Sequence, residues 1–266
     1  MEKININDAP ILEWDDDAAT ESKNYFFAQG KKPFENFKKV QTLGINKCII
    51  FFPRDFEKCT SIYKKCEKIY EFKSASSISP IYLYDKKLLI ALCPLGGPAS
   101  ANLIEELEYI GINIFIACGS CGCLSEELDI TNLFFVPDNA IRDEGLSYHY
   151  LPASRLVNTN AKINKLLAQV LKKHDKPYVK GTVWTIDSMY RETPKRIARR
   201  KQEGAIGVDM ECASLASVAK YNNLEFGSLF YFTDTIGSSS WKWRIYDKIQ
   251  IRTQLLEICI EALCLL

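Results

Sequence analysis

The sequence predicts a single-domain α/β protein in which helices cover both faces of a β-sheet. Short apolar segments alternate with amphipathic segments along most of the 266 residues, which is the order of strands and helices in such a sheet. Most of these apolar segments are continuous, as in strands that are covered on both faces. No Gly/Ser-rich linker or internal repeat divides the sequence, so we expect one domain over residues 1–266.

The expected strands are short apolar runs of four to seven residues. Residues 1–40 lack this regularity, and we expect them to form a peripheral N-terminal segment. The six strands are expected at residues 47–52, 87–93, 113–118, 133–136, 178–184 and 228–232.

The segments between these strands carry apolar residues at helical spacing. Residues 100–111 have Gly111 as a candidate C-cap, and residues 161–175 end with lysines that suit the helix dipole. Thr193 followed by Pro194 is typical of a helix start. Further helices are expected within residues 204–219 and over roughly 245–264.

Composition excludes several classes of protein. The 34 basic and 33 acidic residues give a net charge of +1, which argues against a nucleic-acid binder that works by bulk electrostatics. No apolar window is long enough to span a membrane. The polar, acidic N-terminus does not resemble a signal peptide, so the ten cysteines are expected to be reduced thiols in the cytoplasm. Cys118, Cys121 and Cys123 lack a second Cys or His pair, so we expect no metal site.

Small and polar residues lie at three strand ends, where α/β sheets bind ligands. These segments are residues 93–100, 117–122 and 232–241. Their glycines allow a ligand to approach the backbone, and hydroxyls such as that of Ser120 can bind an anion. Tight turns are the alternative reading of each segment.

Two carboxylates are unusual. Glu211 opens an otherwise apolar helical segment, next to Asp209 and Met210, where a structural helix needs no acid. Asp234 follows an apolar strand, where desolvation raises a carboxyl pKa and allows proton donation near neutral pH. A turn-capping role for Asp234 fits the sequence equally well.

The segment before the helix at Pro194 suits a planar heterocycle. Asp187, Met189, Tyr190 and Arg191 combine an aromatic ring, a soft apolar group and polar groups.

Together these segments resemble the nucleoside phosphorylase family, and within it the uridine phosphorylase-like branch. The resemblance rests on LGGPASANLIEELEYIG, ACGSCGCL, NAIRDEGLSYHYLP, WTIDSMYRETPKRIARRKQEG and VDMECASLASVA, which occur in family order over roughly residues 85–236. It implies a single α/β domain with a central mixed sheet flanked by helices. It also implies a homo-oligomer, either a dimer or a hexamer.

The implied reaction is phosphorolysis of a uridine-like nucleoside to a free base and ribose 1-phosphate. Inorganic phosphate is the co-substrate, and no metal or organic cofactor is needed. The resemblance makes Glu211 and Asp234 catalytic and places Met210 and Glu211 at the ribose. It places Gly97, Gly119, Ser120 and Arg54 at the phosphate, and Gly122, Trp184, Asp187, Met189, Tyr190 and Arg191 at the base.

The chain departs from the family pattern at the phosphate. The usual Gly-Asp-Pro-x-Arg loop is replaced by FFPRDFEK, and Ala117 stands where a second arginine is usual. Arg54, Lys58, Arg142 or a neighbouring subunit are the candidates to supply the missing charge. Two alternatives therefore remain open. One is a hydrolytic nucleosidase that uses water, and the other is a non-catalytic nucleoside-binding protein. The choice between a purine and a pyrimidine base also stays open, because Asp234 stands where purine-acting members of the family have an Asp.

Overall fold

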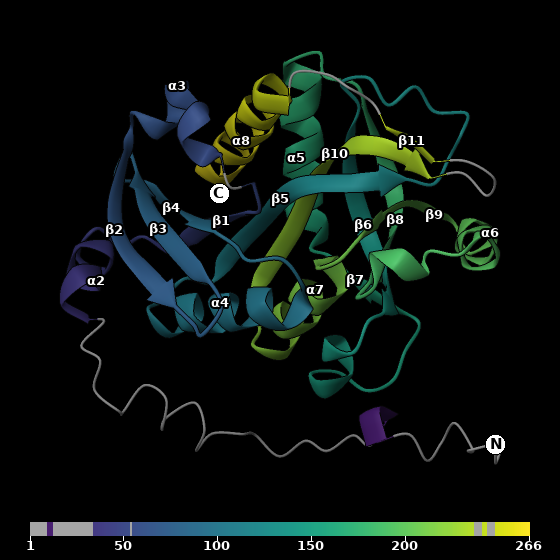
Figure 1. The fold of residues 1–266 in the computed structure, drawn as a ribbon. Helices are drawn as coiled ribbons and strands as arrows, with labels where there is room; N and C mark the ends of the chain where they lie inside the picture. Colours follow the sequence, from purple (N-terminus) through teal and green to yellow (C-terminus); the bar gives the residue numbers. More distant parts are fainter. Residues whose placement is uncertain (1–9, 13–33, 54, 237–240, 244–247) are drawn as a thin grey trace.

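A computed structural model describes residues 10–12, 34–53, 55–236, 241–243 and 248–266 (Figure 1). Arg54 and most of the peripheral segment 1–40 therefore lie outside the described residues. Among the described residues, no helix is long and apolar enough to cross a membrane.

The strands and helices alternate along the chain, as the sequence predicts. The strands are β1 (Lys47–Phe51), β2 (Cys66–Lys73), β3 (Ile78–Tyr84), β4 (Leu88–Leu92), β5 (Ile114–Cys123), β6 (Phe134–Asp143), β7 (Leu156–Asn158), β8 (Tyr178–Ile186), β9 (Ala205–Asp209), β10 (Glu225–Ile236) and β11 (Trp241–Trp243). The α-helices are α2 (Phe34–Thr42), α3 (Thr60–Tyr63), α4 (Gly97–Tyr109), α5 (Ala161–Lys173), α6 (Pro194–Gln202), α7 (Cys212–Tyr221) and α8 (Lys248–Cys264). The single-turn helices are η2 (Pro10–Leu12), η3 (Phe56–Lys58), η4 (Leu146–His149) and η5 (Met189–Arg191).

The described strands form one mixed sheet in the order β11-β10-β6-β8-β9-β5-β1-β4-β3-β2, with β7 paired to β6. Strand β5 also pairs with β10, in parallel. This extra pairing closes β10, β6, β8, β9 and β5 into a ring, from which β1, β4, β3 and β2 extend as an open wing. Strand β5 therefore belongs to both parts of the sheet.

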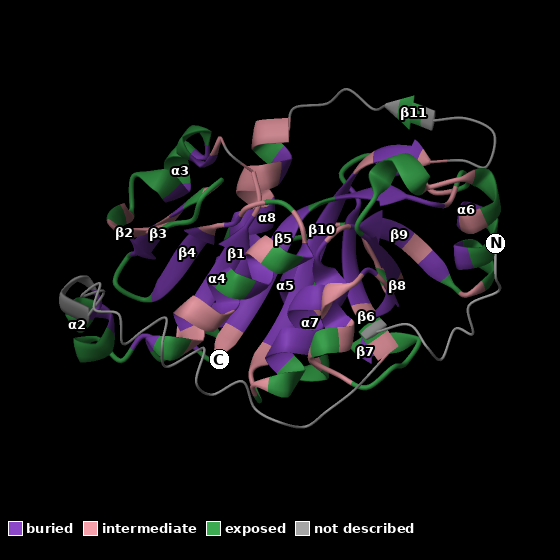
Figure 2. Ribbon diagram, turned by 60° about the horizontal axis from the view of Figure 1, so that its bottom comes forward, coloured by how far each residue is buried: buried purple, intermediate pink, exposed green. Residues whose placement is uncertain are grey.

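Helices cover both faces of the sheet, as expected. Helices α4 and α7 pack on one face through residues such as Leu107 and Leu215, and α5 and α8 pack on the other through residues such as Leu167 and Leu255 (Figure 1). The central strands between these layers are almost wholly buried, whereas much of α6 is exposed (Figure 2).

The helix ends follow the sequence signals. Thr193 caps α6, where its hydroxyl accepts a hydrogen bond from the Arg196 amide, and Pro194 is the first helical residue. Gly111 takes the left-handed conformation after α4, with φ of 101°, as a C-cap glycine does.

Several strand boundaries were predicted wrongly. Strand β5 continues to Cys123, so the expected turn at residues 119–122 is extended backbone. Strand β10 continues to Ile236, so Asp234 lies inside a strand and does not follow one. Strand β9, which precedes α7, and the hairpin of β2 and β3 were not predicted. Pairing with neighbouring strands extends all of these segments, although their glycines and polar residues weaken the local strand signal.

Candidate active site

The second half of β5 brings three strands together. Ser120 is paired with Tyr231 of β10, and Gly122 is paired with both Asp234 of β10 and Val208 of β9. Chain segments from β9 and β10 therefore meet along a few residues of β5. The predicted Ser120, Gly122 and Asp234 share this place, and Glu211 follows β9 only two residues after its last strand residue, Asp209.

Glu211 is buried at the N-cap position of α7, with only 7% of its surface exposed. Its Oε1 atom accepts a hydrogen bond of 2.7 Å from the backbone N–H of Gly96, just before α4. Gly96 has φ of 96°, a conformation that favours glycine. This hydrogen bond fixes one oxygen of the Glu211 carboxyl group.

Asp209 and Thr185 hold the first turn of α7. The Asp209 Oδ2 atom accepts hydrogen bonds from the amides of Glu211 and Cys212, at 3.1 and 2.7 Å. The Thr185 hydroxyl donates to Asp209 Oδ1 at 2.6 Å and accepts from the Ala213 amide at 3.0 Å. The backbone that carries Glu211 is therefore fixed by the end of β8 as well as by β9.

The buried carboxyl groups hold their protons more tightly than free ones. Burial, followed by the neighbouring charge of Asp209, raises the pKa of Glu211 to about 8. Burial also raises the pKa of Asp209 to about 6, although the Thr185 hydroxyl and two backbone amides oppose this shift. The charge of Asp187 raises the pKa of Glu211 further, so this predicted base-side residue lies near the carboxylate.

These shifts predict how stability depends on pH. The pKa of Glu211 is higher in the folded protein than in the unfolded chain, so the folded state binds more protons between about pH 5 and about pH 8. The unfolding free energy is then expected to fall as pH rises through this range. Glu211 contributes a slope of up to about 1.4 kcal/mol per pH unit.

Urea unfolding of the wild type and of Glu211→Gln across this range tests the slope. The Gln side chain keeps an oxygen for the Gly96 amide but does not titrate, so its unfolding free energy should fall less steeply with pH. Equal slopes in the two proteins would contradict a raised pKa at Glu211.

Glu144 is a further buried carboxyl group beside α7. Its Oε2 atom accepts hydrogen bonds from the Ser214 hydroxyl at 2.8 Å and from the Ser147 amide at 3.0 Å. Its Oε1 atom is buried without a hydrogen-bond partner among the described residues. Glu144 also raises the pKa of Asp209, which places it close to the Asp209 carboxylate.

Asp234 lies on the other side of β5, at a bulge in β10. The register with β5 shifts between Phe232 and Asp234, and the carboxylate accepts a 2.6 Å hydrogen bond from the Thr233 hydroxyl. Asp234 is 8% exposed. Its charge adds to burial in raising the pKa of Glu192 to about 7, so Glu192 is an acidic neighbour of Asp234.

The buried thiol of Cys121 lies near both Asp209 and Asp234. Burial raises its pKa, and the charges of Asp209 and Asp234 both raise it further. Asp209 and Asp234 therefore approach Cys121 from β9 and β10. The structure thus brings the predicted Glu211 and Asp234 to the same stretch of β5.

Ser120 is exposed on the face of β5 that α8 covers. Its hydroxyl contacts the phenol of Tyr231, its partner in the strand register. The Tyr231 phenol oxygen also accepts a hydrogen bond of 3.0 Å from Arg252 of α8. Arg252 in turn donates to both carboxylate oxygens of Asp55, at 2.5 and 2.7 Å.

The predicted base-side residues are distributed unevenly. Asp187 accepts a hydrogen bond of 2.9 Å from the Gly145 amide. Met189, Tyr190 and Arg191 form η5, and Tyr190 is 93% exposed. Trp184 is fully buried, and its indole N–H donates to Asp143 at 2.9 Å. Trp184 therefore packs beneath the loop, while η5 faces solvent.

The predicted ribose residue Met210 is half-buried between Asp209 and Glu211. The predicted phosphate residue Gly97 has a packing role. A Cβ atom at Gly97 would lie 2.4 Å from the Ser214 hydroxyl of α7, so glycine allows α4 and α7 to approach closely. Gly119 faces Phe52, which lies just after β1.

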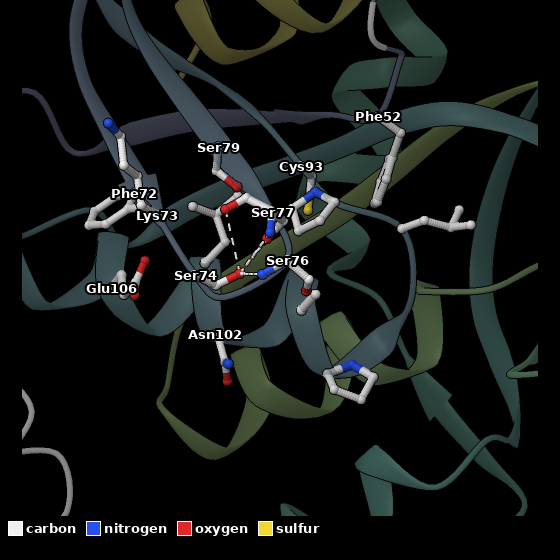
Figure 3. A pocket seen from close by; sticks show the side chains of 15 residues that line it. Phe52, Phe72, Lys73, Ser74, Ser76, Ser77, Ser79, Cys93, Asn102 and Glu106 are labelled. Carbon is white, nitrogen blue, oxygen red and sulfur yellow. Dashed lines mark hydrogen bonds between the residues drawn. The ribbon is translucent and has the colours of Figure 1, made fainter.

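A cavity of about 660 Å³ lies beside this site, between the β2–β3 hairpin and α4 (Figure 3). Phe52 and residues 93–95 form one wall, the serine-rich turn that includes Ser74 forms another, and Asn102 and Glu106 of α4 also face it. Its wall at residues 93–95 directly precedes Gly96, which holds Glu211. Glu211, Ser120 and Asp234 themselves do not line the cavity.

The cationic side chains that were candidates for binding phosphate lie in different surroundings. Arg142 is 2% exposed, and its guanidinium donates to the Ser147 and Ser154 hydroxyls and to two backbone carbonyls, so it holds the 147–154 segment. Lys58 is exposed on η3. Arg54 lies outside the described residues. Arg252, which is adjacent to Ser120 through Tyr231, was not predicted as a phosphate-binding cation.

Comparison with known proteins identifies the family. The sequence pattern of the phosphorylase superfamily matches residues 54–263, which is more than half of the chain. The chain belongs to the phosphorylase superfamily. This match extends beyond both ends of the region on which the sequence resemblance rests, and it covers β5, β9, β10 and α8.

Two individual relatives of this chain share less than a quarter of their residues with it over the matched segments. It is 23% identical over 142 residues to a guanosine phosphorylase of Halorubrum lacusprofundi, covering 53% of this chain and 58% of the relative. It is 24% identical over 158 residues to a uridine phosphorylase of Haemophilus influenzae, covering 58% of this chain and 61% of the relative. The matched segments thus span about three fifths of the length of these curated relatives.

The fold is confirmed by a solved structure. The crystal structure of AMP nucleosidase from Bacteroides thetaiotaomicron superposes with a TM-score of 0.66 at 22% identity, covering 82% of this chain and 87% of the other. The α/β class with a central mixed sheet, predicted from the sequence, is therefore correct for this superfamily member.

Four residues at the site were missed or left without a role in the sequence analysis. Asp209 stands two residues before Glu211, and Asp at a helix start is a capping signal that could have assigned it. Glu144 and Glu192 occur in polar loops, where sequence gives no sign of burial. Arg252 lies near the start of the last helix, and only the packing of α8 on β10 brings it to Tyr231.

Proposed function

We propose that this chain cleaves the N-glycosidic bond of a nucleoside, with inorganic phosphate as the nucleophile. The products are a free base and ribose 1-phosphate. The main support is the buried carboxyl group of Glu211, which the Gly96 amide holds at one oxygen at the start of α7, two residues after the end of β9. A fixed carboxylate of this kind can accept hydrogen bonds from the ribose hydroxyls.

In the proposed reaction, the bond between C1′ and the base nitrogen breaks and its electron pair leaves with the base. The sugar develops oxocarbenium character, and Glu211 in its ionised form stabilises this positive charge through the ribose hydroxyls. A phosphate oxygen, oriented by the Ser120 hydroxyl, forms the new bond to C1′. Asp234, in its protonated form, donates a proton to the departing base, which would otherwise leave as an anion, and becomes a carboxylate.

The proposed substrate is a uridine-like nucleoside, bound with its base toward the loop of Asp187 and η5. Asp234 also suits a purine, because a carboxylic acid can donate a proton to a ring nitrogen of the leaving base. Names of distant relatives include both classes, a guanosine phosphorylase and a uridine phosphorylase.

Hydrolysis is the second candidate, and one observation favours it. The guanidinium adjacent to Ser120 is already paired with Asp55, so the charge that would attract phosphate is partly neutralised. Water, which is uncharged, does not depend on that cation. The same site would then release free ribose in place of ribose 1-phosphate.

Base release from uridine, inosine, adenosine and methylthioadenosine, each with and without phosphate, tests the proposal. Phosphate-dependent release is expected, with ribose 1-phosphate as the second product. Release that is independent of phosphate would establish the hydrolytic alternative. If no base is released from any of the four, the chain does not cleave these nucleosides.

A further inference from the structure

Arg252 lies on the second turn of α8 and points toward the C-terminal end of β1. Its Nε atom donates to the Tyr231 phenol at 3.0 Å, and its Nη1 atom donates to both oxygens of Asp55. The exposed fractions of the Arg252 and Asp55 side chains are 18% and 25%. The ion pair is therefore shielded from bulk water but still reached by it.

Arg252 is one side chain away from the predicted nucleophile site. The Tyr231 phenol, which accepts from Arg252, also contacts the exposed hydroxyl of Ser120. Ser120 and Tyr231 are paired residues of parallel strands, so their side chains leave the sheet on the same face. This face is the one that carries α8.

Arg252 retains donors for another ligand. A guanidinium has five N–H donors, and its planar fork matches the oxygens of phosphate. The hydrogen bonds to Tyr231 and Asp55 use Nε and Nη1, and no hydrogen bond from Nη2 to any residue of the described chain is present. One edge of the guanidinium can therefore bind an anion while Asp55 stays in place.

No other described cation has this connection to Ser120. Arg142 is enclosed by hydroxyls and carbonyls of the 147–154 segment, and Lys58 extends from η3 into solvent. Arg252 comes from the last helix, far in sequence from FFPRDFEK and from Ala117, where the resemblance places the usual arginines.

We propose that Arg252 and Ser120 together form the anion subsite, and that Asp55 competes with the bound anion for the Arg252 guanidinium. Inorganic phosphate is the expected ligand. The role of this anion as nucleophile rests on the proposed function, whereas its binding does not.

The proposal predicts opposite effects for the two members of the ion pair. Asp55→Asn removes the negative charge that pairs with the guanidinium and repels phosphate. Phosphate should then bind about tenfold more tightly, which is the size of the effect expected from two like charges close together near a protein surface. Arg252→Gln removes the cation and should weaken binding by about tenfold or more. Ser120→Ala removes one hydrogen bond and should weaken it by several fold.

Isothermal titration calorimetry of the full chain with inorganic phosphate, in the absence of nucleoside, measures these effects. Glu203→Gln is the matched control, because it also takes a carboxylate from arginine partners but lies at the end of α6. It should bind phosphate as the wild type does. Thermal unfolding of each variant shows whether the fold is retained.

Loss of structure cannot imitate the expected pattern, because an unfolded site does not bind phosphate more tightly. Arg252→Lys, which keeps the charge, should bind more tightly than Arg252→Gln. Equal phosphate affinity in wild type, Asp55→Asn and Arg252→Gln would overturn the proposal, as would the absence of binding in both wild type and Asp55→Asn.

The outcome is separable from the proposed function. If phosphate binding follows the expected order but no nucleoside is cleaved, the anion subsite stands and the proposed reaction fails. If nucleosides are cleaved with phosphate while all these variants bind it equally, the reaction stands and the assignment of Arg252 fails.

Discussion

Glu211→Gln is expected to lower kcat by about 10²- to 10³-fold, because an amide that cannot ionise replaces the carboxyl group whose ionised form stabilises the developing oxocarbenium ion. Gln keeps the size of the side chain and an oxygen for the Gly96 amide, so α7 and its first turn should be unchanged. Steady-state release of base by the purified variant and wild type measures the effect.

Glu225→Gln is the matched control for this substitution. Glu225 carries the same carboxyl group and is half-buried, but it begins β10, at the opposite end of the strand from Asp234. Its substitution should leave kcat unchanged. A Glu211→Gln variant with wild-type turnover would place the ribose elsewhere.

Asp234→Asn is expected to lower kcat by about 10²- to 10⁴-fold for a natural nucleoside, because the base then departs without a proton donor. The amide is close in size to the carboxyl group, so the bulge in β10 should be retained. The loss should be larger for bases that are poorer leaving groups.

A ribose derivative with a nitrophenolate leaving group distinguishes proton donation from a structural role. Nitrophenolate leaves as a stable anion and needs no proton, so Asp234→Asn should cleave it at nearly the wild-type rate. If the variant loses both substrates equally, Asp234 acts on the shape of the site and does not act as a general acid.

The fold class was predictable from the sequence because it follows from local patterns. Continuous apolar runs such as 47–52 and the Thr193–Pro194 helix start depend on neighbouring residues alone. The end of β5 was not predictable, since its last residues are glycines, cysteines and Ser120. These residues are extended because β10 and β9 pair with them.

The candidate site was predictable in part for a similar reason. Glu211 and Asp234 were noticeable because an acid stands out in an apolar segment. Glu192 lies in a polar loop and Arg252 lies near the start of the last helix, where a charged residue is ordinary. Their places beside Asp234 and Tyr231 come from long-range packing, which a single sequence does not display.

The pairing of β5 with both β9 and β10 limits which changes in sequence this protein can tolerate. Ser120 faces Tyr231, and Gly122 faces both Asp234 and Val208, so the separation between these groups is set by main-chain hydrogen bonding. Inserting or deleting one residue there would turn every later side chain to the opposite face. New substrate preferences are therefore expected to arise from the exposed η5 loop and the hairpin beside α4, while the spacing along β5 stays constant.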